Sequence, residues 1–462
     1  MLSLVSVLHL AYKRIFDNFI LQTQPFMKKC LLLFISLLAI KSYGQVTQRL
    51  DSLFDFCHNK FLFNGTVLVA EKDQIVYERS YGYANLEHKT PNTSDTKFRL
   101  GSISKQFTAF IILKLAEQGK LDLNKPAFAY LGHDETQLKG IYIRNLLTHT
   151  SGLKDYTGLP EFDEKKSYTH EDILQKIINA PLVFSPGSNY RYSNSNFFVL
   201  ALVAEKVTGE KFEMLLSDII LNKAGMRNSG EDNDDQYLAK AVARPYMMSY
   251  NKLLPADSIE MKNTIGGGGM YSTARDMFLW STFFQKEFTD KSGLNKFVYS
   301  FSNHNPAGYY SSGWFIKGSH LFHEGHINGF ANLISVDTAS KRTIVILSNS
   351  DFLHLYPVML SVRGVLNNDP AALQWTKGEK ANVKDYLGKY RVANINVELK
   401  EENGQLVGDS PTGRVKLIPF DKDQFYFDNR EAFIVFKRNE RGQIVSLSSF
   451  EDYEWVELKK ID

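Results

Sequence analysis

The order of apolar and polar residues predicts strands on either side of a helical middle region. Residues 63–83 contain two β-branched and aromatic runs around a polar turn, a pattern typical of a β-hairpin. After Gly101 the apolar residues recur at four-residue spacing, which predicts a helix that Gly119 ends. A second helical pattern covers residues 197–207 and stops at Gly209. No internal repeat is present, so the chain does not read as a repeat protein.

The second half of the chain returns to strands after one more helix. Residues 266–269 are all glycine and indicate a flexible run, while Thr273 and Asp276 form a capping-box pattern ahead of the next helix. Residues 321–349 are predicted strands, and the polar residues 367–378 are a predicted linker. Short alternating strands separated by Asn-Gly and Arg-Gly turns follow, so the tail is predicted to be a small all-β barrel or sandwich.

Composition and charge exclude several classes of protein. The chain has 462 residues, too many for one ordinary domain, and its 44% hydrophobic and 23% charged residues are typical of a soluble globular protein. A formal net charge of +3 is too balanced to indicate binding to nucleic acid or to a membrane surface. Two cysteines are too few for a disulfide framework or a multi-cysteine metal site. The function must therefore be sought in motifs.

The amino-terminal residues predict export. Two lysines follow Met27 and precede the apolar residues 30–40, a run shorter than the roughly 20 residues that a membrane-spanning helix needs. We interpret residues 27–44 as a signal peptide and residues 1–26 as an upstream extension, with an uncleaved amino-terminal anchor as the alternative. After cleavage Cys57 would be the remaining cysteine, which excludes an intrachain disulfide, and the protein would be periplasmic or extracellular.

A serine and a lysine three residues apart stand at the start of the first helical pattern. On a helix, Ser102 and Lys105 lie on the same face, so the lysine amine can lie beside the serine hydroxyl. A partly desolvated lysine loses proton affinity and can accept the serine proton, which makes the serine a nucleophile. The alternative is a simple helix cap at Ser102. The same spacing recurs at Ser151 and Lys154, where no periodic helix follows and no catalytic role is expected.

Two further segments carry polar groups ahead of helices or in turns. Tyr192 and Asn194 precede a helix, where a phenol can relay a proton and an amide can orient a substrate carbonyl. A simple turn rich in tyrosine and asparagine is the alternative. His149, in the sequence Thr-His-Thr-Ser-Gly, could be catalytic, but we favour a buried histidine bonded to backbone groups at a helix end.

Histidine and glutamate also cluster in a predicted strand. His323, Glu324 and His326 could suggest a zinc site, because imidazole and carboxylate are zinc ligands. However, His-x-x-His on a strand directs the two rings to opposite faces. We therefore favour a strand edge where His323 faces a cleft and Gly325 lets a substrate approach the backbone closely.

Taken in order, these motifs resemble a known superfamily. The chain resembles the serine β-lactamase and penicillin-binding-protein superfamily, in particular its class C β-lactamase-like branch, through Ser102-x-x-Lys105, Tyr192-x-Asn194 and His323-x-Gly325. The flanking sequences agree over roughly residues 60–350. The resemblance implies an α+β fold of the β-lactamase/transpeptidase type, an antiparallel sheet flanked by helices beside a helical region, followed by a small all-β domain. The expected divisions are 1–26 (extension), 27–44 (signal peptide), 45–366 (serine hydrolase domain), 367–378 (linker) and 379–462 (accessory β-barrel-like domain).

The resemblance implies catalytic roles for three residues. Ser102 would be the acylated nucleophile and Lys105 its proton acceptor. Tyr192 would act as general base and acid in both acylation and deacylation. No metal and no other cofactor is expected.

The resemblance also implies substrate-binding roles. Asn194 would hold the substrate carbonyl, while His323 and Gly325 would contribute to the wall of the cleft. The backbone amides of Ser102 and His326 would form the oxyanion hole, in which each donor lowers the barrier by ~3 kcal/mol.

The third motif departs from the pattern of the lactamases in this branch, which usually have Lys-Thr-Gly where this chain has His-Glu-Gly. Lysine and threonine attract a substrate carboxylate, whereas Glu324 close to that position would repel one by roughly a few kcal/mol. We therefore expect a serine hydrolase that cleaves an ester, an amide or a D-amino-acid peptide, with weak β-lactamase activity at most. The alternatives are a true β-lactamase or D-Ala-D-Ala carboxypeptidase, and an inert binding or sensing homologue. The expected partner is a small-molecule or peptide substrate, with cell-wall fragments among the options. We expect no binding to nucleic acid, and no stable membrane span after the signal peptide is cleaved.

Overall fold

A computed structural model gives the fold of most of the chain. The predicted extension 1–26 and all but the last residue of the predicted signal peptide 27–44 lie outside the residues that it describes. Described are residues 44–60, 63–133, 137–232, 242–249, 252–289, 303–305, 308–351, 353–370, 372–373, 382–392, 395–410, 413–421, 423–427, 433–451 and 454–461.

An antiparallel sheet of eight strands forms the centre of the larger region, in the order β10-β11-β12-β13-β14-β15-β1-β2. Its first two strands in the chain, β1 and β2, are the predicted hairpin, and the turn residues Lys72 and Asp73 take the left-handed conformation that a tight hairpin needs. β1 also pairs with β15, so the start and the end of this region are joined in one sheet. The strands are β1 (Gly65–Glu71), β2 (Gln74–Tyr81), β10 (Asn303–Asn305), β11 (Gly308–Ser311), β12 (Trp314–Lys317), β13 (His320–Ile327), β14 (Phe330–Asp337) and β15 (Arg342–Ser348).

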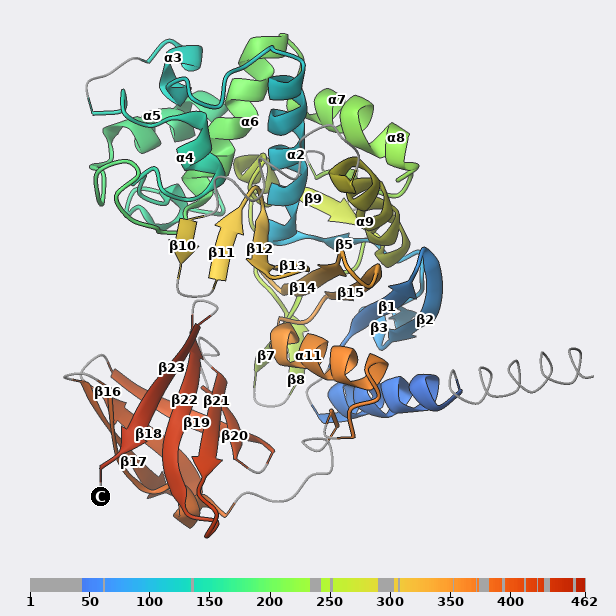
Figure 1. Cartoon of the computed structure of the whole chain (residues 1–462), viewed down its shortest axis with the longest axis vertical. Coiled ribbons are helices and arrows are strands. Elements are labelled where there is room, and N and C mark those ends of the chain that lie inside the picture. The colour runs from blue at the N-terminus through green and yellow to red at the C-terminus, as the bar shows by residue number, and fades with distance from the viewer. Residues whose placement is uncertain are drawn as a thin grey trace, which may run out of the picture.

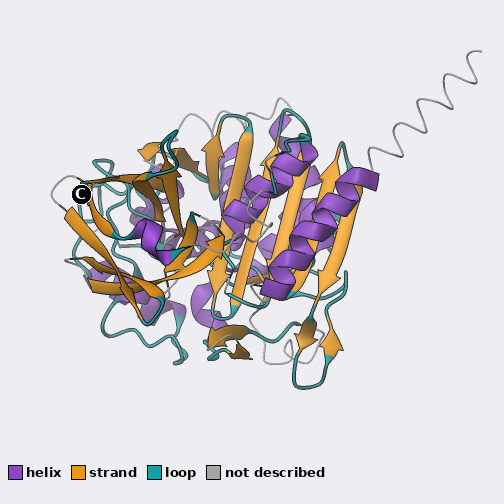
Figure 2. Cartoon of the chain, turned by 90° about the horizontal axis from the view of Figure 1, so that it is seen from below, coloured by secondary structure: helices purple, strands orange, loops and turns teal. Residues whose placement is uncertain are grey.

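Helices cover both faces of this sheet. α11 (Leu355–Leu366) packs on β14 and β15, and Figure 2 shows it beside the helix of residues 44–60 on one face. α9 (Ala274–Thr289) packs on β15 and β1 from the other side (Figure 1). Both faces of the central strands are therefore buried, which explains their nearly continuous apolar sequences.

The predicted capping box at the start of α9 is half correct. The backbone N–H of Asp276 donates to the Thr273 hydroxyl at 3.1 Å, as predicted for the cap. The Asp276 carboxylate instead accepts hydrogen bonds from the backbone of Asn228 and the hydroxyl of Ser229. The carboxylate therefore joins a distant loop to α9 and does not close the box.

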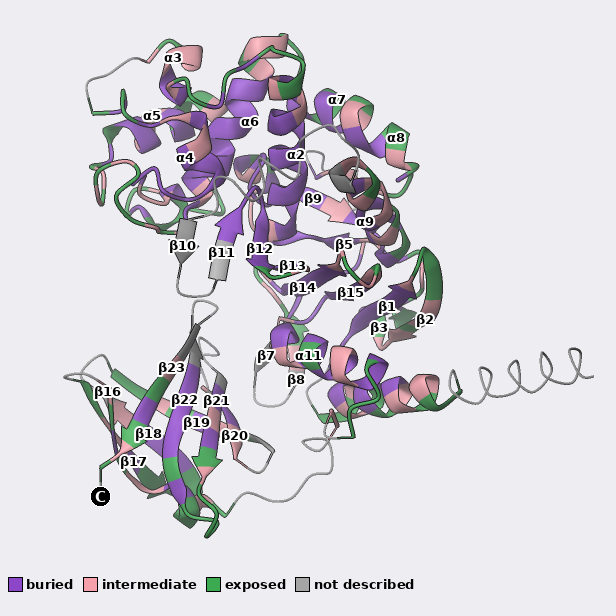
Figure 3. Cartoon of the chain, viewed as in Figure 1, coloured by how far each residue is buried: buried purple, intermediate pink, exposed green. Residues whose placement is uncertain are grey.

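A helical region lies on one side of the sheet, built around α2 (Ser104–Glu117) and α6 (Asn194–Thr208), which pack on each other. Figure 3 shows that both are buried over most of their length. As predicted, α2 ends just before Gly119 and α6 ends at Gly209, both in the left-handed conformation. The remaining helices here are α3 (Ala127–Leu131), α4 (Ile143–Leu147), α5 (His170–Asn179), α7 (Phe212–Leu216) and α8 (Asn222–Ala224).

Shorter strands complete this larger region. β5 (Phe98–Arg99), β9 (Met270–Ser272) and β6 (Gly230–Glu231) form a three-stranded sheet in that order. Two small hairpins pair β3 (Tyr83–Asn85) with β4 (Thr90–Pro91) and β7 (Tyr246–Ser249) with β8 (Lys252–Pro255).

The carboxy-terminal strands close into an eight-stranded antiparallel barrel, β16 to β23. The barrel has its own apolar core, which includes Tyr390, Leu417 and Phe425, so the predicted all-β tail is confirmed as a barrel. Part of the predicted linker 367–378 lies outside the described residues. The strands are β16 (Gly388–Val392), β17 (Ile395–Glu402), β18 (Gln405–Ser410), β19 (Gly413–Asp421), β20 (Gln424–Phe427), β21 (Phe433–Arg438), β22 (Ile444–Glu451) and β23 (Glu454–Lys460).

Within the described ranges, no helix has the length and apolar character required to cross a bilayer.

Candidate active site

Ser102 and Lys105 lie where a short helix meets α2. Ser102 is in the 3₁₀ turn Gly101–Ile103 and is partly exposed, whereas Lys105 is in the first turn of α2 and is fully buried. The Nζ atom of Lys105 lies 2.9 Å from the Oγ atom of Ser102. The predicted pair is thus in direct contact, and Ser102 makes no side-chain cap to α2.

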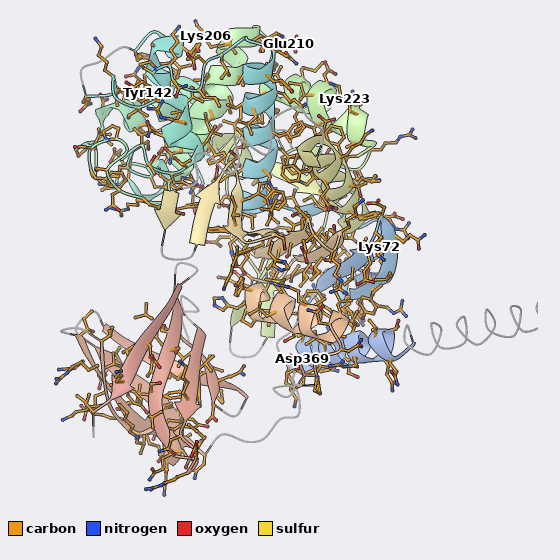
Figure 4. All side chains as sticks on the ribbon, viewed as in Figure 1. Lys72, Tyr142, Lys206, Glu210, Lys223 and Asp369 are labelled. Atoms are coloured by element: carbon orange, nitrogen blue, oxygen red, sulfur yellow. The ribbon has the colours of Figure 1, made fainter. Side chains whose placement is uncertain are left out.

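The amine of Lys105 is held by two other oxygen atoms. It lies 2.7 Å from Oδ1 of Asn194 and 2.8 Å from the carbonyl oxygen of Gly267. Burial lowers the pKa of Lys105 from 10.5 to about 7, although the carboxylate of Asp155 raises it in part. Exposed lysines such as Lys206 and Lys223 on the outer surface (Figure 4) keep contact with water, so burial is what distinguishes Lys105. Near neutral pH much of the Lys105 amine is therefore neutral and able to accept a proton.

Tyr192 contributes a buried hydroxyl beside the pair. Its ring centroid lies 4.9 Å from the Nζ atom of Lys105. The hydroxyl has no hydrogen-bond partner of ordinary geometry among the described residues. Burial raises the pKa of Tyr192 well above 10.0, and the neighbouring side chain of Ser102 offsets only part of this rise. The phenol is therefore protonated at rest and offers its proton, so Lys105 is the better first acceptor of the serine proton.

Asn194 is the first residue of α6, and its amide is oriented at both ends. Its Oδ1 atom faces Lys105, and its Nδ2 atom donates to Oδ2 of Asp155 at 2.9 Å. No motif in the sequence marks Asp155, which lies in a loop with no periodic pattern. Only its residue type could have indicated it, because aspartate is a common helix cap and its carboxylate caps the 3₁₀ turn Tyr156–Gly158.

His149 has the structural role that the sequence favoured. Its Nδ1 atom accepts hydrogen bonds from the backbone N–H of Ser193, at 3.1 Å, and from Nδ2 of Asn196, at 2.8 Å. Its ring centroid lies 4.2 Å from that of Tyr192. Burial and the charge of Lys105 hold the pKa of His149 well below 6.5. A neutral His149 therefore joins the start of α6 to the face of the Tyr192 ring.

The side chain of His323 faces the same site from β13. Its Nδ1 atom lies 2.5 Å from the carbonyl oxygen of Glu324, to which it donates, so its Nε2 atom accepts the hydroxyl proton of Tyr310 at 3.2 Å. Its ring centroid lies 6.2 Å from that of Tyr192. Burial lowers the pKa of His323 to about 3, so the imidazole is neutral. The carbonyl of Glu324 fixes the tautomer of His323, and Tyr310, which no motif in the sequence marks, helps to hold its orientation.

The predicted position of Glu324 is wrong. Neighbouring residues on a strand point to opposite faces, and with His323 facing the site, Glu324 faces α11. Its Oε1 atom accepts a hydrogen bond from the backbone N–H of Tyr356, at 3.1 Å, in the first turn of α11. This carboxylate stabilises a helix start and does not face a substrate, so the expected repulsion of a substrate carboxylate by Glu324 is withdrawn.

Gly325 and His326 bring β13 against the chain just before Ser102. A Cβ atom on Gly325 would lie 1.9 Å from the carbonyl oxygen of Leu100, so the chain's own backbone approaches this glycine, where a substrate had been expected. A Cβ atom on Gly101 would lie 2.7 Å from the carbonyl oxygen of His326. The backbone of His326 therefore lies against that of Gly101, the residue before Ser102, while the side chain of His326 is exposed. The oxyanion hole formed by the amides of Ser102 and His326 stays a prediction.

The glycine run is a close contact and not a flexible segment. Residues 266–269 are all buried, and a Cβ atom on Gly266 would lie 2.6 Å from the carbonyl oxygen of Phe197. Its φ of +67° also favours glycine. This approach places the carbonyl of Gly267 on Lys105, a contact that no side-chain motif could have indicated.

The second Ser-x-x-Lys sequence has a different role. The Oγ atom of Ser151 donates to Oδ1 of Asn196 at 2.5 Å and accepts from the backbone N–H of Leu153. Ser151 therefore holds the loop before Asp155, as expected of a copy without a catalytic role.

Across the described ranges, no group of three His, Cys, Asp or Glu side chains is placed to hold a metal ion.

This arrangement can activate a hydroxyl and pass its proton onward. The Oγ–H of Ser102 can give its proton to the neutral amine of Lys105, and the serine oxygen can then attack an electrophilic carbon. When a bond to that carbon breaks, the protonated phenol of Tyr192 can give its proton to the departing atom and be reprotonated from Lys105. The two backbone amides can stabilise the negative charge that forms on a carbonyl oxygen.

Comparisons with known proteins show the family and the fold. A profile of the beta-lactamase family matches residues 63–359. Penicillin-binding protein 4* of Bacillus subtilis (strain 168) is 30% identical over 338 residues, which is 66% of this chain and 72% of that protein. The structure of the octameric penicillin-binding protein homologue from Pyrococcus abyssi is similar with a TM-score of 0.65 at 20% identity, over 89% of this chain and 99% of that one. A D-amino acid amidase from Ochrobactrum anthropi SV3 gives a TM-score of 0.58 at 22% identity, over 72% and 99%.

Proposed function

The chain belongs to the beta-lactamase family of serine hydrolases, and on that premise we propose that it cleaves esters or amides through an acyl-enzyme on Ser102. D-amino-acid peptides are included among the amides, and β-lactams are poor substrates. The observation that carries the proposal is the contact of 2.9 Å between a fully buried lysine amine and a partly exposed serine hydroxyl.

The proposed acylation uses the groups that surround Ser102. Lys105 takes the proton of Ser102 while the serine oxygen bonds to the substrate carbonyl carbon, and the amides of Ser102 and His326 receive the oxyanion. Cleavage of the ester or amide bond expels an alcohol or amine, which is protonated by Tyr192. Water then attacks the acyl-enzyme, gives up a proton through the same groups, and releases the acid and Ser102.

The third motif supports a preference for substrates without a carboxylate. Lactamases of the branch that the sequence resembles place a lysine where this chain has His323, and His323 is neutral and donates to a carbonyl of its own strand. A neutral imidazole supplies no charge to attract a carboxylate, so the preference comes from His323 and not from Glu324. The D-amino acid amidase among the structural neighbours, which shares the fold, is consistent with amide substrates.

A substrate panel tests the proposal. Purified protein and its Ser102→Ala variant are given neutral p-nitrophenyl esters, D-aminoacyl anilides and the cephalosporin nitrocefin. We expect Ser102-dependent release of product from an ester or an anilide. Turnover of nitrocefin should be at least about tenfold slower than turnover of that substrate, a difference of ~1.4 kcal/mol in the activation barrier. Nitrocefin turnover as fast as that of an established lactamase would contradict the substrate preference.

The protein is exported, with residues 27–44 removed, residues 45–366 forming the hydrolase domain and residues 379–462 an accessory domain. Its substrates are small molecules or peptides, with cell-wall fragments among them. Amino-terminal sequencing of protein recovered from the periplasm or medium tests the export. A mature chain that starts near Gln45 is expected, and a chain that keeps the lysines after Met27 would contradict it.

A further inference from the structure

The carboxylate of Asp155 occupies a position between a loop cap and the site. Its Oδ1 atom accepts hydrogen bonds from the backbone N–H and the hydroxyl of Thr157, at 3.0 and 2.8 Å. Its Oδ2 atom accepts from the backbone N–H and the Nδ2 atom of Asn194, both at 2.9 Å. A carboxylate can only accept here, so it requires the amide of Asn194 to present its NH₂ group to Asp155 and its oxygen to Lys105.

This orientation determines where the lone pair of Lys105 points. A neutral amine has two N–H groups and one lone pair, and three oxygen atoms surround Nζ: the amide oxygen of Asn194, the carbonyl of Gly267 and the hydroxyl of Ser102. The first two can only accept, so they take both N–H groups. The lone pair is left for the hydroxyl of Ser102, which alone of these three groups can donate. A flipped Asn194 would donate to this lone pair and occupy it.

We propose that Asp155 is a positioning residue, which fixes the amide of Asn194 so that the lone pair of Lys105 is directed at the Ser102 hydroxyl. This inference rests on the proposed function, because it concerns how the serine is activated. A simple cap for the loop at Thr157 would need only one carboxylate oxygen, and the second oxygen makes both contacts to Asn194.

Asp155 also acts on Lys105 through its charge. Of the titratable groups around Lys105, the carboxylate of Asp155 raises its pKa, whereas His149, His323 and Tyr192 are uncharged near neutral pH. Removal of the carboxylate therefore lowers the pKa of Lys105 and moves the pH at which the base becomes neutral to a lower value. A neutral residue that held the loop equally well would not have this effect on the pKa of Lys105.

The test is the pH dependence of ester hydrolysis by Asp155→Asn. We expect kcat on the high-pH plateau to fall by about tenfold or more, because asparagine no longer dictates the orientation of Asn194, while KM changes little. We also expect the acid limb of kcat/KM to move to lower pH. The matched control is Asp163→Asn, an exposed aspartate of the following loop that should behave as the wild type.

Two further measurements keep the result interpretable. Asp155→Ser retains an acceptor for the cap of the turn at Thr157 and removes the charge, so it replaces Asp155→Asn if that variant does not fold. In the Asn194→Ala background, Asp155→Asn should lower the plateau kcat little further, since both changes remove the same orientation.

The proposal is overturned if the plateau keeps its height, if the acid limb does not move, or if the two substitutions reduce kcat independently. Wild-type protein without Ser102-dependent hydrolysis would instead contradict the proposed function. An active wild type with unaffected Asp155 variants would contradict this inference alone.

Discussion

The pH dependence of hydrolysis follows directly from the burial of Lys105. An ordinary lysine with a pKa of 10.5 would be neutral in roughly one molecule in 3,000 at pH 7, whereas a pKa of about 7 leaves about half of the molecules with a neutral amine. Since the base must be neutral to take the proton of Ser102, kcat/KM should rise with pH through the pKa of Lys105 and then level off.

The neighbouring groups leave this titration isolated. The pKa of His323 is lowered to about 3 and that of His149 lies well below 6.5, while the pKa of Tyr192 lies well above 10.0. Between about pH 5.5 and 9, Lys105 should therefore account for the acid limb of the profile. The assay measures kcat/KM for a neutral p-nitrophenyl ester across this range, with Ser102→Ala as the blank for spontaneous hydrolysis.

The outcome distinguishes a buried base from an ordinary one. We expect the acid limb of kcat/KM to be centred within about one pH unit of 7, because burial lowers the pKa of Lys105 to about 7. A limb near pH 10, or a rate that is flat down to pH 5.5, would refute the assignment of Lys105 as the acceptor of the serine proton. Lys105→Ala should lower the plateau by about 10²-fold or more.

Three substitutions test other parts of the structure. Gly325→Ala should lower kcat/KM by roughly 10²-fold, because its Cβ would lie 1.9 Å from the carbonyl oxygen of Leu100 and displace the chain before Ser102. The control is Gly158→Ala, whose Cβ would meet nothing within 4 Å. Wild-type activity in Gly325→Ala would disprove the close contact between β13 and the chain before Ser102. Glu324→Thr should leave the preference between neutral and carboxylate-bearing esters unchanged within about twofold and lower stability by about 1 kcal/mol at the start of α11, so a clear change in preference would place Glu324 back in the cleft. Arg99→Met breaks a buried ion pair with Asp232 at 2.7 Å and should cost about 3–5 kcal/mol of unfolding free energy in urea denaturation, and a loss below about 1 kcal/mol would contradict its burial.

Local patterns in the sequence were sufficient for the elements that depend on neighbouring residues. The hairpin of β1 and β2, the ends of α2 and α6, and the strands of the barrel follow from spacing, turn residues and glycine stops. Three ordered motifs mark the segments that the fold brings together, so Ser102, Lys105, Tyr192, Asn194 and His323 lie close to one another. Gly325 contacts the backbone of Leu100 and not an open cleft, and the side chain of His326 is exposed. Their chemical roles remain a prediction that the experiments above address.

The missed features depend on contacts between distant parts of the chain. Asp155 and Asn194 are far apart in sequence, Tyr310 fixes His323 from another strand, and Gly267 contributes a backbone carbonyl that no side-chain pattern can reveal. The position of Glu324 is different, because alternation along a strand already implied that it faces away from His323. The prediction for Glu324 was wrong because it placed His323, Glu324 and Gly325 on the same face of the strand.

The central claim is that Ser102 is a nucleophile activated by Lys105, and covalent labelling tests it most directly. The protein is treated with a fluorophosphonate, and its intact mass and the labelled peptide are determined by mass spectrometry. A single adduct on Ser102, absent from Ser102→Ala and formed more slowly by Lys105→Ala, is the expected result. An unlabelled protein, or an adduct that persists in Ser102→Ala, would contradict the account.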